Sequence, residues 1–369
     1  MYIYIRQSLS IPEEKNDKHW REFLFAESMQ KSFDNTLLIG SDFNHYKKKH
    51  YSNIFKDFSF KLKLIKTLGY SSNSSFFRVL DAWFFSFKLF FYILFKTPMR
   101  STVICSFPTP ESALLSSFAC ILKRNRFILD FRDAWPEALP KKNKLLNIIF
   151  NIYIKLILFL IRPLAESTIY MSGKMQDYYS LDIRSYIIPN WFSAQKQNNI
   201  PVQPNIVFAG TISSQFDFSL LVKLSKIDCF VNFTFDVYGD GPLFDFYSDM
   251  FQKFDNVVFH GKISYEKLMC IFQSCSMFFI PYSNPSLFEN HLNNKIIEMV
   301  AFNKPILTNL NTSIFSFGDT KLEIGLNFSE IEEYSKNQLL DTLKIFDNNA
   351  DNLFSKDAFD LQLKEFLNC

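Results

Sequence analysis

The sequence predicts an α/β protein made of two Rossmann-like, doubly wound domains that face each other across a cleft. Three observations lead to this prediction. With 369 residues, the chain is longer than a single hydrophobic core usually supports. Short apolar runs alternate with helical patterns in two separate series, as in proteins built around parallel sheets. A polar, proline-containing stretch, "WFSAQKQNNIPVQPN" at 191–205, separates the two series.

The apolar runs give the order of the expected strands. In the first series they are 36–41, 102–107, 126–131, 167–172 and 185–190, and in the second 205–210, 233–241, 256–261, 276–283 and 304–309. We therefore expect an N-terminal domain at 1–190, a linker at 191–204, a C-terminal domain at 205–350, and a helix at 351–369 that can pack back on the N-terminal domain.

Charge is divided unequally between the two halves. Residues 1–190 hold 27 Lys and Arg against 16 Asp and Glu, a net charge of +11, whereas residues 191–369 hold 13 against 21, a net charge of −8. A basic half is expected to face a polyanion. Because the chain shows no nucleic-acid-binding motif, the anionic surface of a membrane is the preferred partner and nucleic acid is not expected.

The cysteines and histidines predict no metal site and no cofactor. The six cysteines include no CxxC pair, and the five histidines are scattered, so no zinc-ligand spacing is present. The N-terminus lacks the pattern of a signal peptide. These features favour a reduced cytoplasmic protein with buried structural cysteines.

Two apolar stretches have two interpretations. At 81–96 and 145–162 the polar residues fall on one side of a helix, and neither stretch reaches the roughly 20 uninterrupted apolar residues of a membrane span. Each is either a core helix beneath the first sheet or a helix lying in a membrane interface. In the second case Lys141, Lys142 and Lys144 would meet anionic headgroups.

In the second half, glycines follow two expected strands. Gly210 ends "NIVFAG", and Gly239 and Gly241 lie in "VYGDGP". Such glycines let the backbone approach a phosphate closely, although turn glycines also follow strands in any α/β fold. Lys295 and Glu298 lie three positions apart on an expected helix, where they can contact a phosphate and a ribose, or form an ordinary intrahelical ion pair.

In the first half, the stretch "RFILDFRDAWPEALP" at 126–140 ends a buried strand with charge. Asp130, Arg132, Asp133 and Glu137 are either part of a catalytic site or part of a buried network capped by Trp135. The basic loop "HYKKKHY" at 45–51 is either solvated or in contact with a lipid-linked diphosphate or the membrane surface.

The order of these motifs resembles a known enzyme family. "FAG", "YGDGP", "NVVFHGKISYEKL", "FIPYS", NKxxE and "NKPIL", over residues 205–310, are similar to the C-terminal half of GT-B glycosyltransferases, nearest to retaining glycosyltransferase family 4. "DFRDAWP" and the loops at 41–51 and 69–78 resemble its bacterial surface-polysaccharide branch. The resemblance implies donor binding by Gly210, Thr211, Ser213, Gly239, Gly241, Asn294, Lys295 and Glu298. It implies acceptor binding by His45, Asn73, Arg78 and Trp135.

The resemblance also implies a reaction. A sugar would pass, with retention, from a nucleotide-diphospho-sugar to a saccharide or polyprenyl-diphosphate-linked acceptor in capsule, O-antigen or exopolysaccharide synthesis. The protein would act at the inner face of the bacterial plasma membrane, as a peripheral protein. No DxD motif of the metal-dependent GT-A type is present, so metal-independent transfer is expected.

The expected catalytic residues are Asp133, which would orient the acceptor or take its proton, and Arg132. The family's usual arginine after the first glycine is absent, and the second half contains no arginine. Arg132 would therefore supply positive charge toward the leaving diphosphate. Two rival functions remain open at this point: a GT-B sugar-nucleotide epimerase, and a non-catalytic partner that binds the membrane or another transferase.

Overall fold

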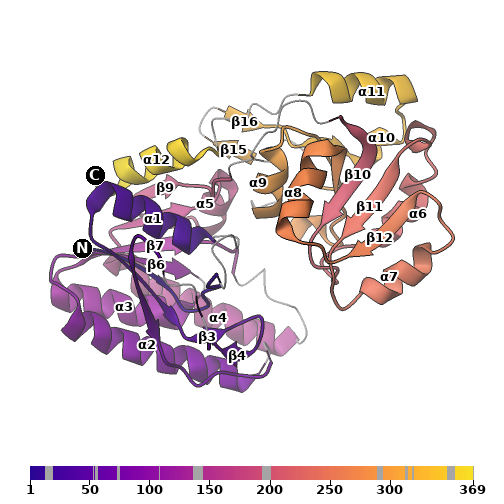
Figure 1. The fold of residues 1–369 in the computed structure, drawn as a ribbon. Helices are drawn as coiled ribbons and strands as arrows, with labels where there is room; N and C mark the ends of the chain where they lie inside the picture. Colours follow the sequence, from indigo (N-terminus) through magenta and orange to yellow (C-terminus); the bar gives the residue numbers. More distant parts are fainter. Residues whose placement is uncertain are drawn as a thin grey trace. The chain divides into compact units, whose positions relative to one another are not determined.

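The computed structural model divides the chain into two compact units, which are described separately (Figure 1). One unit is formed by Met1–Met171, Met175–Ile188 and Asp360–Cys369, and the other by Ser172–Lys174 and Pro189–Phe359. The structure describes residues 1–12, 20–52, 54, 57–72, 75–107, 109–135, 144–192, 201–288, 294–311, 315–317, 320–346 and 354–368.

The first unit contains a seven-stranded parallel sheet with the strand order β5-β2-β1-β6-β7-β8-β9. Its strands are β1 (Tyr2–Arg6), β2 (Thr36–Ser41), β5 (Lys61–Ile65), β6 (Thr102–Phe107), β7 (Arg126–Phe131), β8 (Ser167–Tyr170) and β9 (Ser185–Ile187). The short strands β3 (Phe43–Asn44) and β4 (Lys49–His50) form a separate hairpin. The first strand, β1, lies in the interior of the sheet. The strands β2 and β5 follow on one side of it, and β6 to β9 follow on the other side, which is the doubly wound arrangement.

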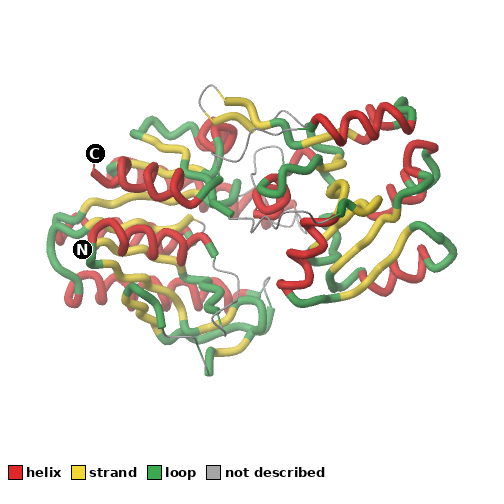
Figure 2. Tube along the Cα trace, turned by 45° about the horizontal axis from the view of Figure 1, so that its top comes forward, coloured by secondary structure: helices red, strands yellow, loops and turns green. Residues whose placement is uncertain are grey.

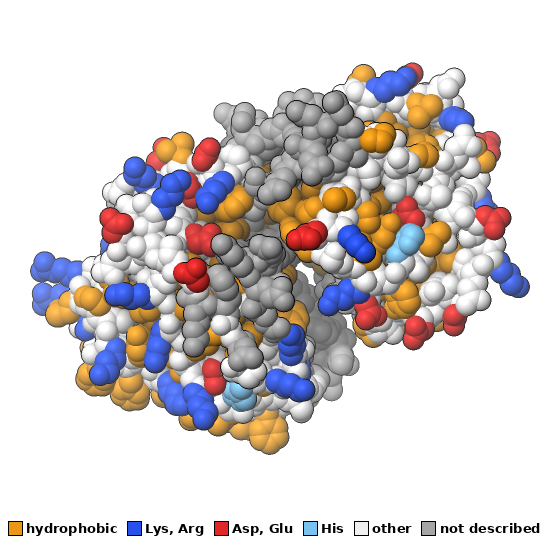
Figure 3. Space-filling view, viewed as in Figure 1, with side chains coloured by type: hydrophobic (Ala, Val, Ile, Leu, Met, Phe, Trp, Pro, Cys, Tyr) orange, Lys and Arg blue, Asp and Glu red, His pale blue; other side chains and the backbone are white. Residues whose placement is uncertain are grey.

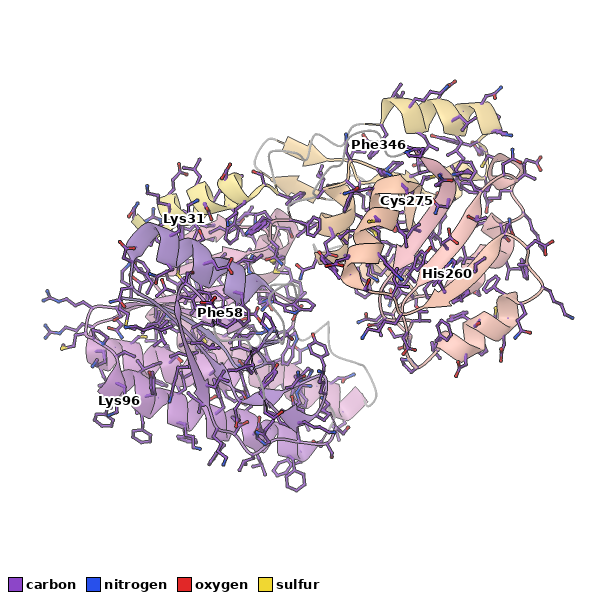
Figure 4. The ribbon with its side chains drawn as sticks, in the orientation of Figure 1. Lys31, Phe58, Lys96, His260, Cys275 and Phe346 are labelled. Carbon is purple, nitrogen blue, oxygen red and sulfur yellow. The ribbon has the colours of Figure 1, made fainter. Side chains whose placement is uncertain are left out.

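Helices cover both faces of the first sheet (Figure 1). They are α1 (Arg21–Phe33), α2 (Phe76–Lys96), α3 (Pro110–Lys123), α4 (Lys144–Ile161), α5 (Gly173–Tyr179) and α12 (Lys356–Asn368), with a 3₁₀ turn at Arg162–Leu164. The helices α2, α3 and α4 lie together on one face, whereas α1 and the part of α12 that belongs to this unit lie on the other. Lys31 in α1 contacts Asp360 in α12 at 2.9 Å (Figure 4).

The second unit also consists of strands flanked by helices (Figure 2). Its main sheet is parallel and six-stranded, with the order β12-β11-β10-β13-β14-β17. Its strands are β10 (Gln203–Ala209), β11 (Thr234–Tyr238), β12 (Val257–Gly261), β13 (Cys275–Ile280), β14 (Ile306–Thr308) and β17 (Gly325–Asn327), and β15 (Phe315–Phe317) pairs with β16 (Thr320–Leu322). Its helices are α6 (Leu221–Leu224), α7 (Phe244–Phe251), α8 (Tyr265–Ser274), α9 (Asn294–Val300), α10 (Phe328–Ile331) and α11 (Lys336–Ile345), with 3₁₀ turns at Phe218–Leu220, Asp228–Phe230 and Pro285–Leu287.

All ten strands predicted from the apolar runs are present, several of them shorter than predicted. Two strands of the first sheet were not predicted, β1 and the edge strand β5. Of these β1 matters more, because it lies between β2 and β6 and its end contributes to the site described below.

A buried ion pair fixes α1 to the first sheet. The side chains of Arg21 in α1 and Asp130 in β7 are fully buried, and Arg21 Nη2 lies 2.7 Å from Asp130 Oδ1. Arg21 Nε donates to the same carboxylate, at 3.0 Å from Oδ2, and the hydroxyl of Tyr4 in β1 also donates to it. Burial raises the pKa of Asp130, but the Arg21 charge and these hydrogen bonds outweigh burial, so the pKa is lowered overall.

Replacing Asp130 by Asn is expected to destabilise the protein by about 3–5 kcal/mol, because it leaves the buried Arg21 charge uncompensated. Urea unfolding followed by tryptophan fluorescence measures the loss, since three of the four tryptophans, Trp20, Trp83 and Trp135, belong to the first unit. Lys31→Ala, which breaks the exposed pair with Asp360, should cost less than about 1 kcal/mol.

Asp130→Asn should also change how the free energy of unfolding depends on pH in the acid range. A carboxylate with a lowered folded-state pKa contributes stability above its unfolded pKa of about 4, and this contribution is lost as the pH falls. The wild type should therefore lose stability more steeply than Asp130→Asn below about pH 4. Equal stabilities at pH 7 and parallel acid limbs would show that the pair is not needed.

Candidate functional site

In each sheet the strand order reverses between two neighbouring strands, β1 and β6 in the first unit and β10 and β13 in the second. Ligands of doubly wound proteins bind outside the carboxyl ends of the strands at this switch point. The residues that follow these strands are therefore the candidate sites of the two units.

Arg6 ends β1 at the switch point of the first sheet, and it was not predicted as a site residue. Its Nη1 donates to the buried Ser106 Oγ of β6 at 2.9 Å. Within the part of the chain that the structure describes, no carboxylate lies at ion-pair distance from Arg6. Burial and the neighbouring charge of Arg132 lower the pKa of Arg6. Arg6 thus brings a positive charge to this edge that no described acidic side chain neutralises by direct contact.

Arg132 and Asp133 follow β7 at the same edge of the sheet. Arg132 Nη1 pairs with Glu22 Oε2 of α1 at 2.6 Å, and both side chains are largely buried. Burial lowers the pKa of Arg132, but Glu22 and the further acidic neighbours raise it more, so the guanidinium stays charged. The half-buried Asp133 contributes to the electrostatic surroundings of both Arg132 and Arg6.

Two tyrosines of α5 hold the turn after β7. The hydroxyl of Tyr179 donates to the carbonyl of Asp133 at 2.7 Å and accepts from the amide of Trp135 at 3.0 Å. The hydroxyl of Tyr178 donates to the carbonyl of Trp135 at 3.2 Å. The backbone that carries Asp133 and Trp135 is therefore fixed, which a site for an oriented hydroxyl requires.

His45 lies in a basic group of side chains beyond β2. Its Nδ1 bonds to the hydroxyl of Tyr70, and the ammonium of Lys48 lies 4.8 Å from the centre of the Tyr70 ring. Burial, followed by the charges of Lys48, Arg78 and Arg6, lowers the pKa of His45 to about 4. Two of the residues expected to bind an acceptor, His45 and Arg78, are thus close enough to interact electrostatically, and their role stays a prediction. Asn73 and Glu137 lie outside the described residues.

The glycines of the second unit bring two loops into direct backbone contact. A Cβ added to Gly239, whose φ is +135°, would lie 1.9 Å from the carbonyl oxygen of Gly210. The amide of Gly210 donates to Tyr238, and the amide of Gly239 donates to Gly261. These glycines are therefore needed for the close packing of the loops after β10 and β11, and their own amides are used within the protein.

The next residues of this loop include amides that are not used by the described protein. Among the described residues, no acceptor is bonded to the amide of Thr211, Ser213 or Ser214, and Thr211 and Ser214 are exposed. The amide of Ile212, between them, donates to the carbonyl of Asp240 at 3.0 Å. Backbone amides without a described acceptor, at the end of a parallel strand, suit an anion.

Lys295, from the first turn of α9, brings a charge to this loop. Its Nζ lies 4.0 Å from the ring centre of Phe208 and 4.3 Å from that of Phe216, so the ammonium contacts both aromatic faces. A Cβ built on Gly210 would lie 2.2 Å from the same Nζ, although the flexible lysine could move aside. The φ of Gly210, +148°, is the stronger reason for glycine at this position, because L side chains rarely adopt it. The rings of Phe208 and Phe216 were not predicted as parts of this site.

The start of α9 is held by an amide pair. The side-chain amide of Asn190 donates to Oδ1 of Asn294, next to Lys295. Glu298, one turn further along α9, is half-buried. The structure thus places five of the expected donor-binding residues in one region, with Gly239 in contact with it: Gly210, Thr211, Ser213, Asn294 and Lys295. That Glu298 binds the ribose of a donor stays a prediction.

In the described parts of the chain, no group of three or more His, Cys, Asp or Glu side chains is arranged to hold a metal ion. The aspartate and histidine that do come together in the second unit, Asp236 and His260, form a pair at 2.7 Å across two strands (Figure 4). The prediction that the reaction needs no metal stays a prediction.

No family model matches the chain, and no curated protein matches it. Solved structures do. HepE from Anabaena in complex with UDP is 14% identical, covers 100% of this chain and 99% of its own, and has a TM-score of 0.64. Sucrose-phosphate synthase from Thermosynechococcus elongatus is 12% identical, covers 100% and 98%, and has a TM-score of 0.64.

A third similar structure is the apo form of the lipopolysaccharide outer core galactosyltransferase WaaB, which is 12% identical, covers 99% and 95% of the two chains and has a TM-score of 0.52. At these identities the likeness shows the fold. The chain has the GT-B fold, with two Rossmann-like domains that each contain a parallel sheet, as predicted.

His45 is expected to be neutral at pH 7 and to titrate at about 4, because burial and the adjacent cations disfavour the imidazolium. NMR titration of the imidazole signals measures this pKa. Lys48→Met should raise the pKa of His45 by removing the cation with the largest effect on it, but not to the ordinary 6.5, because burial remains. Lys47→Met, at the exposed neighbouring position, serves as the control. A wild-type His45 that titrates near 6.5 would contradict this electrostatic description.

Proposed function

We propose that the protein is a glycosyltransferase that uses a nucleotide-diphospho-sugar as donor. The observation that carries the proposal is the contact of Lys295 Nζ with the loop after β10, at the switch point of the second sheet. In the same loop, no described acceptor is bonded to the amides of Thr211 and Ser213. One point charge together with several backbone amides suits a diphosphate. HepE, which shares the fold, was solved with UDP and with UDP-glucose.

In the proposed reaction, the bond between the anomeric carbon and the diphosphate oxygen breaks while a new bond to the acceptor oxygen forms on the same face of the sugar. The acceptor hydroxyl loses its proton, and the diphosphate leaves with the negative charge. Lys295 and the loop amides stabilise the leaving group. Glu298 accepts hydrogen bonds from the ribose, and the glycine loops with Gly239 and Gly241 shape the site around the nucleotide.

On the acceptor side, Asp133 orients the hydroxyl and receives its proton, and Arg132 contributes positive charge toward the diphosphate. His45, Asn73, Arg78 and Trp135 bind the acceptor, to which we add Arg6. A neutral His45 can accept a hydrogen bond from a sugar hydroxyl, which its low pKa permits at pH 7.

The finer assignments follow the resemblance to retaining glycosyltransferase family 4. They are retention, independence of metal ions, transfer of a hexosyl or N-acetylhexosaminyl group, and a saccharide or polyprenyl-diphosphate-linked acceptor. The pathway would be the synthesis of capsule, O-antigen or exopolysaccharide. The charge of Arg6, which no described carboxylate contacts directly, together with Arg78 and Lys48 near His45, favours an acceptor that carries a phosphate or diphosphate.

Lys295→Met is expected to weaken the binding of UDP by about 10–100-fold, the loss of one charge-assisted contact to a diphosphate. Isothermal titration calorimetry measures the affinity, after a thermal-shift screen of UDP, GDP, ADP and dTDP has identified the base. UMP or its equivalent should bind more weakly than the diphosphate to the wild type, and this preference should shrink in Lys295→Met.

The matched control is Lys253→Met, an exposed lysine of the same unit, which should bind the nucleotide as the wild type does. If Lys295→Met keeps full affinity and full preference for the diphosphate, the donor site has been assigned to the wrong residues. If no nucleotide binds to the wild type, the proposed donor class is wrong.

A further inference from the structure

We propose that the layer formed by α2, α3 and α4 is a docking surface for an anionic lipid bilayer. This inference goes beyond the proposed reaction, because it assigns a partner to the face of the first unit that carries these three helices. It depends on the exposure and charge of that face and on no property of the nucleotide site.

The three helices expose 18 large apolar side chains, a set too large for scattered surface residues of a soluble protein. In α2 they are Phe76, Phe77, Leu80, Phe84, Phe87, Phe91 and Phe95; in α3 Phe118, Ile121 and Leu122; and in α4 Leu145, Ile148, Ile149, Phe150, Ile152, Leu156, Phe159 and Leu160. Figure 3 shows hydrophobic side chains, with lysines and arginines among them, along the part of the first unit where α2 lies.

In α2 the exposed side chains follow the period of a helix, and so do the buried ones. Phe85, Leu89 and Ile93 are fully buried, whereas Phe87, Phe91 and Phe95 are 52%, 53% and 69% exposed. Such a helix is apolar on two opposite faces, of which the protein buries one. Among the described rings, Phe87, Phe91 and Phe95 contact only neighbours on α2 itself, namely Trp83, Phe90 and one another.

The helix α4 repeats this arrangement. Ile154, Ile157 and Ile161 are buried, while Ile152, Leu156 and Phe159 are 62%, 55% and 73% exposed. The hydroxyl of Tyr153 donates to Glu111 of α3 at 2.7 Å, which ties α4 to its neighbour. By length and hydropathy alone, one helical segment of the described chain, Asn147–Leu164, could cross a bilayer. Because its inner face packs on the unit, α4 suits a position in the plane of the interface instead.

The charges on the three helices identify an anionic partner. Their only acidic residues, Asp81 and Glu111, are 1% and 5% exposed, whereas Lys88, Lys96 and Lys155 are exposed. Lys96 lies at the end of α2, close to aromatic rings that project outward (Figure 4). An apolar face bordered by basic side chains matches the acyl chains and headgroups of an anionic membrane. In a dimer of two such faces the lysines would meet like charges, which disfavours a second copy as the occupant.

Co-sedimentation with lipid vesicles tests the proposal on the full-length protein. The wild type should bind vesicles of phosphatidylglycerol and phosphatidylcholine, bind vesicles of phosphatidylcholine alone more weakly, and lose affinity as salt is added. The triple variant Phe87→Ser, Phe91→Ser, Phe95→Ser should bind at least ~100-fold more weakly, because three aromatic side chains no longer enter the interface. Its melting temperature should stay close to that of the wild type, since all three positions are exposed.

The matched control is the triple variant Val231→Ser, Phe246→Ser, Ile345→Ser, which removes apolar side chains that are 67%, 58% and 81% exposed on the second unit. It should bind vesicles as the wild type does. The double variant Lys88→Glu, Lys96→Glu should lose the preference for phosphatidylglycerol and keep its fold.

Three results would overturn the proposal: no binding of the wild type to either kind of vesicle, equal losses in the two triple variants, or a wild-type dimer that the aromatic triple variant dissociates while vesicles bind neither protein. Nucleotide binding by these variants should equal that of the wild type. The failure of this inference is therefore distinguishable from the failure of the proposed donor site.

Discussion

The buried contact of Asp130 with Arg21 and Tyr4 positions the site of the first domain. It joins β7, α1 and β1, and its position fixes where the neighbouring residues lie. Glu22 follows Arg21 on α1 and pairs with Arg132, two positions after Asp130. The Asp130–Arg21 pair is therefore structural and fully buried, with its acidic residue in the sheet and its basic residue in α1. In the next pair, Arg132–Glu22, the basic residue follows β7 at the edge of the sheet and the acidic residue lies in α1. This explains why a hydrophobic strand ends in so much charge: the inner charges hold the elements that orient the outer ones.

The second domain uses backbone contact for the same purpose. Gly239 lies against the carbonyl of Gly210, so the two loops after β10 and β11 act as one surface, and the ammonium of Lys295 completes it from α9. This half contains no arginine, and the ammonium of Lys295 contacts the faces of two aromatic rings, Phe208 and Phe216. An arginine at position 295 would not be equivalent, because the lysine ammonium is a compact point charge whereas the guanidinium is planar.

The sequence predicted the fold well because strands of a parallel sheet are buried on both faces and appear as continuous apolar runs. It missed β1, whose "YIYIR" is short and begins at residue 2, and β5, an edge strand with exposed lysines at 61 and 63. It identified Asp130 and Arg132 in one charged group and assigned a catalytic role to Arg132, but it could not show which residues each of them contacts. These partners, Tyr4, Arg21 and Glu22, lie more than 100 residues away in the chain. Arg6 and the rings around Lys295 were missed for the same reason, since only the folded sheet brings them together.

The claim that this protein transfers a sugar is tested most directly by the products it forms. The purified protein is incubated with the nucleotide sugar that binds best and with lipid extracted from bacterial membranes, and both fractions are analysed by mass spectrometry. The account predicts free nucleotide diphosphate and a lipid or saccharide that has gained one sugar residue, with the rate about 100-fold or more lower in Asp133→Asn. An isomerised sugar nucleotide, or a nucleotide sugar that binds and is returned unchanged with every acceptor fraction, would contradict it.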